Sequence, residues 1–277
     1  MGATLRQSPL KATALKAAGW IVVLGGSLVA LAFAPLLVVA VPVYLGYLLM
    51  RRGKKHSVEI GENALLKDTR APVLYLRSFL DEAAEASIGH RFKGVRRLET
   101  TQIAATVANN GLQEQDALGH VFRKIGPYVA LGKPGETLPE LGSNKIYVPN
   151  EAWQAQVRNL LKQSRLIVFR AGRTEGLKWE LNELLRTTNP GRVLVLLPVE
   201  DDDYSSFAHW ANGLMPESFP LDYPSSRLVV FDDDWSPRYL PPRRSLTETL
   251  SPFFERNGIV VKETFWEKLL EHNGLRW

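Results

Sequence analysis

The sequence predicts an α/β fold, in which a parallel sheet of about five strands carries helices on both faces and follows a transmembrane helical hairpin. Short apolar runs rich in β-branched residues alternate with stretches of helical periodicity, which indicates a strand–helix alternation. The apolar runs are nearly continuous, as is typical of parallel strands buried on both sides. An uncharged run over residues 17–50 predicts the hairpin.

The uncharged run is longer than the roughly 20 residues of a single membrane crossing. Pro35 and Pro42 interrupt it, so we expect two helices, 17–33 and 35–50, that turn near Pro35. The basic, acid-free flanks favour the cytoplasmic side. One kinked, tilted helix is the alternative, and a signal peptide fits less well because the run lacks an Ala-x-Ala exit. We therefore expect a multi-pass cell-membrane protein that contacts the lipid bilayer and has a cytoplasmic soluble domain.

The positive charge belongs to this N-terminal part. The chain of 277 residues has a net charge of +5 and no cysteine. Residues 1–57 contain seven basic side chains and no acidic one: Arg6, Lys11, Lys16, Arg51, Arg52, Lys54 and Lys55. The rest of the chain is therefore slightly acidic, which argues against nucleic acid as a partner. The lack of cysteine excludes disulfides, thiol catalysis and cysteine-based metal sites.

The soluble part reads as strands and helices in alternation. Five strands are expected at 72–79, 127–132, 165–172, 192–198 and 227–231. Helical patterns occupy most of 81–125 and the stretches 150–164, 175–188 and 264–274, and the acidic, aromatic stretch 201–226 is expected to be a loop. The predicted parts are a basic tail (1–16), a transmembrane hairpin (17–50), a linker (51–70), the α/β domain (71–235) and a C-terminal extension (236–277).

Ligands of parallel α/β folds bind beyond the carboxyl ends of the strands. This rule brings three loops to one crevice: 77–79, 132–138 and 170–174.

The other motifs of the sequence either do not match a known binding motif or are not specific for one. The stretch "GPYVALGKP" has five residues between its glycines where a phosphate loop has four. The histidines have no metal-type spacing, and the two Asp triplets, 201–203 and 232–234, are expected to be solvated, so no metal site is predicted.

Glu180 is the candidate that the helical periodicity selects. At about 100° per residue, Leu177, Leu181, Leu184 and Leu185 form one core face, and Glu180 lies at its edge in the first turn of the helix. A carboxylate at the partly solvent-exposed edge of an apolar face can stabilise a developing positive charge. The alternative is a solvated surface acid beside the half-buried Trp179.

Three stretches resemble the TIR domain family, whose fold is a flavodoxin-like parallel sheet. "VLYLRSF" stands where the family has its first strand, and "GKPGETLP" resembles the loop after its second strand. "WQAQVRNLLKQSRLIVFRAGRTEGLKWELNELL" resembles the helix, strand and helix that carry an aromatic residue followed by Glu. The resemblance covers roughly residues 72–234, and the whole pattern looks like a group of bacterial membrane-anchored TIR-like proteins.

The resemblance implies an NAD⁺ glycohydrolase, a bacterial defence or stress effector, in which Glu180 is the catalytic carboxylate. NAD⁺ is then the substrate, and no cofactor is implied. The expected contacts with NAD⁺ are Arg77, Ser78, Phe79, Gly132, Pro134, Gly135, Arg170, Arg173, Thr174 and Trp179. Each arginine has the alternative of a surface ion pair, and Trp179 the alternative of a core residue.

Two other functions stay open at this stage. The resemblance equally allows a non-catalytic signalling module that associates with itself into a homo-oligomer. A sensor that binds a nucleotide in the same crevice without turnover is the third reading.

Overall fold

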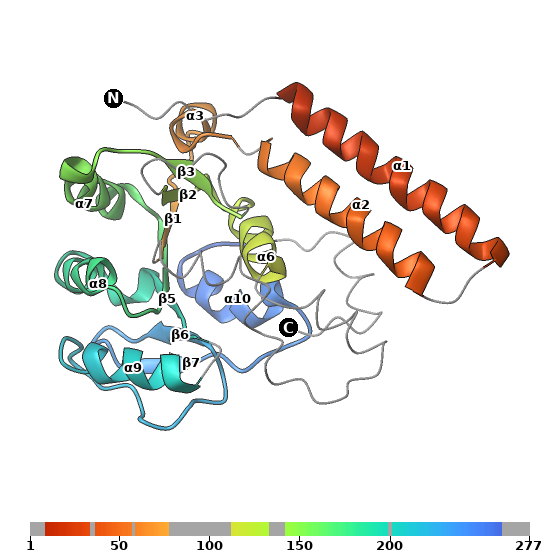
Figure 1. Ribbon diagram of the computed structural model, residues 1–277. Helices are drawn as coiled ribbons and strands as arrows, with labels where there is room; N and C mark the ends of the chain where they lie inside the picture. Colours follow the sequence, from red (N-terminus) through yellow and green to blue (C-terminus); the bar gives the residue numbers. More distant parts are fainter. Residues whose placement is uncertain are drawn as a thin grey trace. The chain divides into compact units, whose positions relative to one another are not determined.

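The computed structural model describes residues 9–33, 37–56, 59–77, 112–132, 142–198 and 201–261 (Figure 1). The chain divides into two compact units. One unit comprises Met1–Ile60 with Gly132–Leu141, and the other comprises Gly61–Leu131 with Gly142–Trp277. Most of the expected helical region 81–125 and the expected helix 264–274 lie outside the described residues, apart from a helix that begins at Leu112.

The first unit contains two long helices, α1 (Pro9–Phe33) and α2 (Leu37–His56), which pack against each other in an antiparallel pair (Figure 1). Small residues let their backbones approach closely. A Cβ atom added at Gly19 would lie 2.8 Å from the carbonyl oxygen of Gly46, and one at Gly53 would lie 2.8 Å from that of Ala12. The helical hairpin itself is therefore present.

The membrane-spanning part of the prediction is wrong. Among the helices of the described residues, none has the length and apolar character needed to cross a bilayer. Both helices also contain charged residues, Lys11 and Lys16 in α1 and the residues after Met50 in α2. The predicted multi-pass membrane localisation is therefore not supported either.

The second unit is built on a mixed sheet of seven strands in the order β3-β2-β1-β4-β5-β6-β7. The strands are β1 (Val73–Leu76), β2 (Tyr128–Leu131), β3 (Asn144–Ile146), β4 (Leu166–Arg170), β5 (Val193–Leu196), β6 (Leu228–Phe231) and β7 (Pro237–Tyr239). The first five run parallel to one another, whereas β6 is antiparallel to both of its neighbours, β5 and β7. Sequence order along the sheet reverses at β1, which lies between β2 and β4.

The α/β class and the five expected strands are confirmed, but the purely parallel sheet is wrong. The fifth expected strand, β6, pairs antiparallel with β5, with Val195 opposite Val229. Two short edge strands, β3 and β7, were not expected from the sequence. Both are three residues long and contain polar side chains, so neither produces an apolar run.

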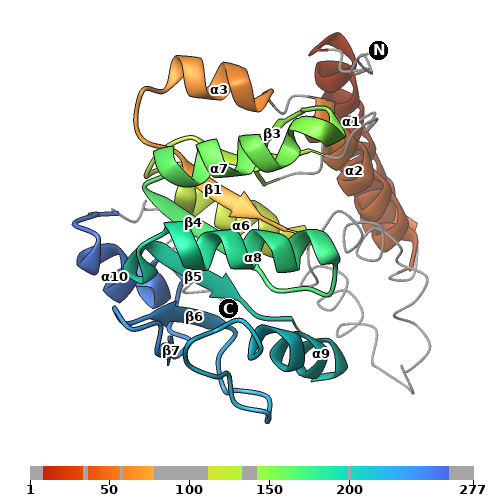
Figure 2. The same cartoon turned by 90° about the vertical axis from the view of Figure 1, so that its left-hand side faces the viewer.

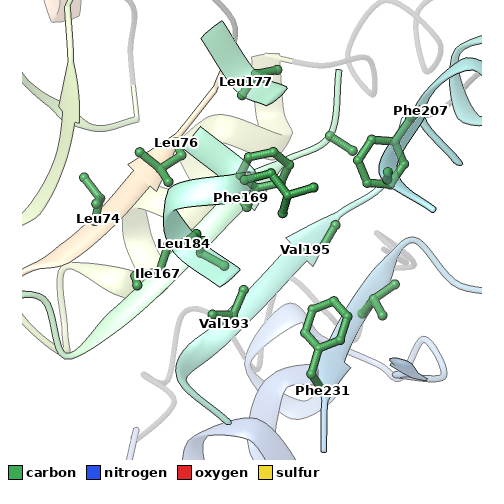
Figure 3. Packing of buried hydrophobic residues seen from close by; sticks show 14 of the residues in the cluster. Leu74, Leu76, Ile167, Phe169, Leu177, Leu184, Val193, Val195, Phe207 and Phe231 are labelled. Carbon is green, nitrogen blue, oxygen red and sulfur yellow. The ribbon is translucent and has the colours of Figure 1, made fainter. Parts of the chain in front are cut away.

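Helices cover both faces of the sheet (Figures 1 and 2). One face packs against α7 (Trp153–Gln163), α8 (Glu175–Thr187) and α9 (Asp201–Ala211), and the other packs against α6 (Leu112–Phe122) and α10 (Leu246–Arg256). A short helix, α3 (Gly61–Lys67), lies beside β3. Successive strand residues alternate between the two faces, so Leu74 and Leu76 join the first core (Figure 3). Val73 and Tyr75 join the second core.

The stretch 201–226 is not a loop throughout, because its beginning forms α9. The three aspartates 201–203 lie in the first turn, where the helix dipole favours negative charge. Tyr204, Phe207 and Ala211 follow at helical spacing and are buried in the core. The second Asp triplet pairs with arginines, since Asp232 lies 3.1 Å from Arg238.

Candidate functional site

The carboxyl ends of β1 and β4 mark the point at which strand order reverses, where α/β sheets bind ligands. Leu76 pairs with Phe169, so Arg77 at the end of β1 and Arg170 at the end of β4 are neighbours. Arg77 is buried and Arg170 half-buried. The structure therefore brings two of the expected ligand contacts together at this position.

Both arginines belong to the face of the sheet that α6 and α10 cover. The guanidinium carbon of Arg77 lies 5.7 Å from the ring centre of Tyr75, which is part of that core. Burial raises the pKa of the Tyr128 hydroxyl well above its usual value of 10, and the positive charges of Arg77 and Arg170 oppose this rise. Two arginine side chains thus lie at the carboxyl ends of the central strands on this side.

The loop after β4 is held by its own contacts. Gly172 accepts a hydrogen bond of 3.1 Å from the indole nitrogen of Trp210 on α9. Arg173 lies 3.2 Å from Asp203, and both side chains are partly exposed. Thr174 is the N-cap of α8, because its hydroxyl oxygen accepts a bond of 3.4 Å from the backbone nitrogen of Leu177. Arg173 and Thr174, which were expected to contact the ligand, have structural partners here.

Replacing Thr174 by Ala is expected to lower the free energy of unfolding by about 1 kcal/mol, because the first turn of α8 loses its cap. Urea unfolding of the two proteins measures the difference. Thr174→Ser, which keeps the hydroxyl, should stay close to the wild type. A Thr174→Ala protein of unchanged stability would contradict the capping role.

Glu180 lies in the second turn of α8 and is more buried than the sequence indicated. Only 7% of the residue is exposed, and its Oε2 atom has no hydrogen-bond partner among the described residues. Leu177, Leu181 and Leu184 of the same helix reach the core on this face. Glu180 is therefore a carboxyl group in an apolar layer, close in sequence to the end of β4.

This environment changes the acidity of the group. Burial raises the pKa of the Glu180 carboxyl from its usual 4.5 to about 8. An ionised carboxylate in a low-dielectric layer without a partner is unfavourable, so the group keeps its proton at neutral pH. A buried titratable group with a strongly shifted pKa near the ligand-binding end of a sheet is a candidate functional residue.

Trp179 forms part of an aromatic and cationic contact between α7 and α8. Its ring lies 4.7 Å from the ring of Trp153 in an edge-to-face arrangement. The guanidinium carbon of Arg158 lies 5.1 Å from the Trp179 ring centre, and Arg158 also forms an ion pair of 3.0 Å with Glu183. Trp179 thus packs against the core between the two helices. Local spacing in the sequence did not indicate Trp153 and Arg158 as neighbours of Trp179, because they lie on a different helix.

The predicted site residues fall into two groups on the two sides of the sheet. Arg77 and Arg170 are on the α6 side, whereas Trp179 and Glu180 are on the α7–α8 side. Gly132 follows β2 directly and is buried. Four further predicted contacts lie outside the described residues: Ser78, Phe79, Pro134 and Gly135.

Comparison with known proteins adds no assignment to this geometry. No family model, curated protein or solved structure matches the chain. The TIR resemblance therefore stays a prediction, which depends on the residues quoted for it.

A separate cavity of about 230 Å³ opens between α6, the end of β5 and the start of α10. Leu118, Leu196 and Leu246 line it together with Arg227, whose guanidinium donates to the carbonyl of Leu197. These leucines belong to the core opposite Glu180. The lining contains no carboxylate, so this cavity offers no acid for catalysis.

Proposed function

We propose that this protein hydrolyses the bond between nicotinamide and ribose in NAD⁺, with Glu180 as the catalytic carboxylate. The observation that carries the proposal is the burial of Glu180, whose Oε2 atom has no partner among the described residues, in the helix that follows β4. A carboxyl group in this setting costs folding free energy, and such groups are concentrated at functional sites.

The reaction requires one negatively charged group of the protein beside the nicotinamide ribose of NAD⁺. As the bond between ribose C1′ and the pyridinium nitrogen breaks, both electrons go to the nitrogen and nicotinamide leaves as a neutral molecule. Positive charge develops on the ribose, and the Glu180 carboxylate would stabilise it, as carboxylates do in glycosidases. Water then adds to C1′ and loses a proton. No acid is required for the leaving group, which is consistent with a single catalytic carboxyl.

The arginines support a dinucleotide as the substrate. Arg77 and Arg170 are neighbours at the strand ends on one side of the sheet, and Glu180 belongs to the helical layer on the other. An extended dinucleotide that crosses the carboxyl ends of β1 and β4 would put its phosphates near the arginines and its nicotinamide ribose towards α8. Guanidinium groups are well suited to phosphate oxygens.

The raised pKa of Glu180 fits a substrate that carries a positive charge. In the protein alone, the carboxyl with a pKa of about 8 holds its proton at pH 7. A pyridinium ring bound beside it would favour the carboxylate, because an opposite charge at short range lowers the pKa of an acid. Binding of NAD⁺ would then ionise the catalytic group in the place where the reaction needs it.

The test is the release of nicotinamide from NAD⁺ by the purified full-length chain. Glu180→Gln is expected to lower the rate roughly 100- to 1,000-fold, the usual effect of removing one group that stabilises transition-state charge. Glu175→Gln is the matched control, because Glu175 lies on the same helix and pairs at the surface with Lys178 at 2.6 Å. This control should keep the wild-type rate.

Two results would count against the proposal. Equal rates in the wild type and Glu180→Gln would remove the catalytic role of Glu180. Binding of NAD⁺ without any nicotinamide release, measured by calorimetry, would favour the nucleotide sensor instead.

A further inference from the structure

The outer side of α1 carries an apolar stripe that the helical hairpin leaves uncovered. Gly19 and Val23 face α2, since a Cβ atom at Gly46 would contact both residues. On the other side of the helix, Leu10, Ile21 and Leu24 are 83%, 71% and 60% exposed. A helix that is apolar on all sides is normally enclosed on all sides, and α2 covers only one of them.

The stripe has the spacing of a coiled-coil seam. Its described members are exposed residues that follow one another at intervals of four, three, four and three: Leu10, Ala14, Ala17, Ile21 and Leu24. The sequence continues the same spacing with Leu28 and Leu31. A repeat of 3.5 residues keeps one line of side chains facing a partner helix along its whole length. The two alanines allow a close approach of the partner's backbone.

The charges along α1 favour a second copy of the same helix as that partner. The stripe contains no charged residue, and the basic residues Lys11 and Lys16 both lie near the N-terminal end of α1. An antiparallel copy presents an identical apolar seam and keeps the two basic ends apart. Such a contact is isologous and closes into a dimer, because each copy uses the same surface.

We propose that the α1–α2 hairpin is a self-association module, which pairs with the hairpin of a second copy through the outer stripe of α1. In this arrangement the two α1 helices lie between the two α2 helices, and the stripe becomes interior. This inference is independent of the proposed hydrolase activity, since it depends only on residues of α1 and α2.

Site-specific cross-linking tests the contact directly. The chain contains no cysteine, so Ile21→Cys introduces a single thiol into the stripe. Under mild oxidation this variant should form a disulfide-linked dimer in high yield. Leu66→Cys is the control, because Leu66 on α3 is 81% exposed but lies outside the hairpin. Equal yields from the two variants, or no dimer from Ile21→Cys, would overturn the proposal.

A second experiment measures the association of the full-length chain by sedimentation equilibrium. The wild type should be a dimer or larger, and the double substitution Ile21→Glu with Leu24→Glu should weaken association roughly 100-fold or more, because it removes apolar burial from both copies. Leu221→Glu, at a residue that is 78% exposed in the sheet unit, should leave association unchanged. Circular dichroism checks that the double variant keeps its helices.

Three results would overturn the proposal. One is a monomeric wild type, and another is a double variant that associates as tightly as the wild type. The third is a wild type that binds phospholipid vesicles through the stripe and gives no cross-link between copies, which would assign the stripe to a lipid surface.

Discussion

Replacing Glu180 by Gln is expected to stabilise the protein at pH 8 by roughly 3 to 5 kcal/mol relative to the difference between the two proteins near pH 4.5. The effect comes from the cost of ionising a buried carboxyl group. Glu180 is 7% exposed, and burial raises its pKa from 4.5 to about 8. Glutamine has nearly the same shape and carries no charge at any pH, so it lacks this cost.

The direction follows from proton binding. Between pH 4.5 and about 8, the folded protein keeps the proton of Glu180 while the unfolded chain has lost it. The folded state therefore binds more protons, and its stability falls as the pH rises, by about 1.4 kcal/mol for each pH unit. Above pH 8 the carboxyl is ionised in both states, and the loss is complete. The contribution of this group is thus fully present below pH 4.5.

Urea unfolding at pH 5, 6, 7 and 8 measures this slope in the wild type and in Glu180→Gln. The comparison uses the change with pH, because a buried amide also has hydrogen-bonding needs that shift the variant by a constant amount. Glu175→Gln should run parallel to the wild type, since Glu175 is exposed. Wild-type and Glu180→Gln curves that stay parallel would show that Glu180 ionises as an ordinary surface acid.

A gain in stability on removal of a side chain is informative about that side chain. Most core substitutions destabilise a protein, whereas residues at functional sites are often kept at a cost in folding free energy. The expected gain at pH 8 and the expected loss of nicotinamide release concern the same carboxyl group. The two measurements together distinguish a catalytic Glu180 from a buried acid without a role.

The sequence predicted the centre of the sheet well and its edges poorly, for a physical reason. Strands β1, β4 and β5 are fully apolar apart from Arg170, because helices cover them on both faces. Edge strand β3, with the sequence Asn-Lys-Ile, is defined mainly by its pairing with β2. The direction of β6 is likewise set by its partner β5, and no local pattern encodes it.

The candidate site shows the same limit. Helical periodicity selected Glu180 from the acidic residues of α8, but it predicted a partly solvent-exposed position for this side chain. The neighbouring positions on α8 contact α7, whose Trp153 packs against Trp179 and whose Arg158 binds Glu183. These contacts join residues that are more than twenty positions apart in the sequence, so local spacing could not reveal them. Arg173 was assigned to a ligand because its partner Asp203 is distant in the sequence. The N-cap role of Thr174, whose partner is the nearby Leu177, could have been predicted from local spacing.

The apolar run of α1 and α2 was interpreted as a membrane crossing because hydropathy alone does not distinguish lipid from protein as the apolar neighbour. No helix among the described residues has the length and apolar character of a membrane span. The spacing of its exposed residues, rather than their hydropathy, is what indicates a helical partner.

Replacing Phe169 by Ala is expected to destabilise the protein by about 3 to 5 kcal/mol, the usual cost of removing a buried aromatic ring. Phe169 is fully buried on the central strand β4, where Figure 3 shows it among side chains from β1, β5 and α8. Urea unfolding at pH 7 measures the loss. Leu66→Ala, at an exposed position on α3, should change the stability by less than about 0.5 kcal/mol. A loss below about 1 kcal/mol for Phe169→Ala would mean that the core collapses into the vacated space.

The same variant tests whether the Phe169 ring is needed to exclude water from the Glu180 carboxyl group. Phe169 and Leu177 of α8 belong to one core, so a cavity at Phe169 loosens the packing beneath the first turns of that helix. Water that enters this layer solvates the carboxylate and brings its pKa back towards 4.5. The stabilisation by Glu180→Gln at pH 8 should then be smaller in the Phe169→Ala background than in the wild type, which a double-mutant cycle measures. An unchanged gain would show that the layer around Glu180 stays dry without the Phe169 ring.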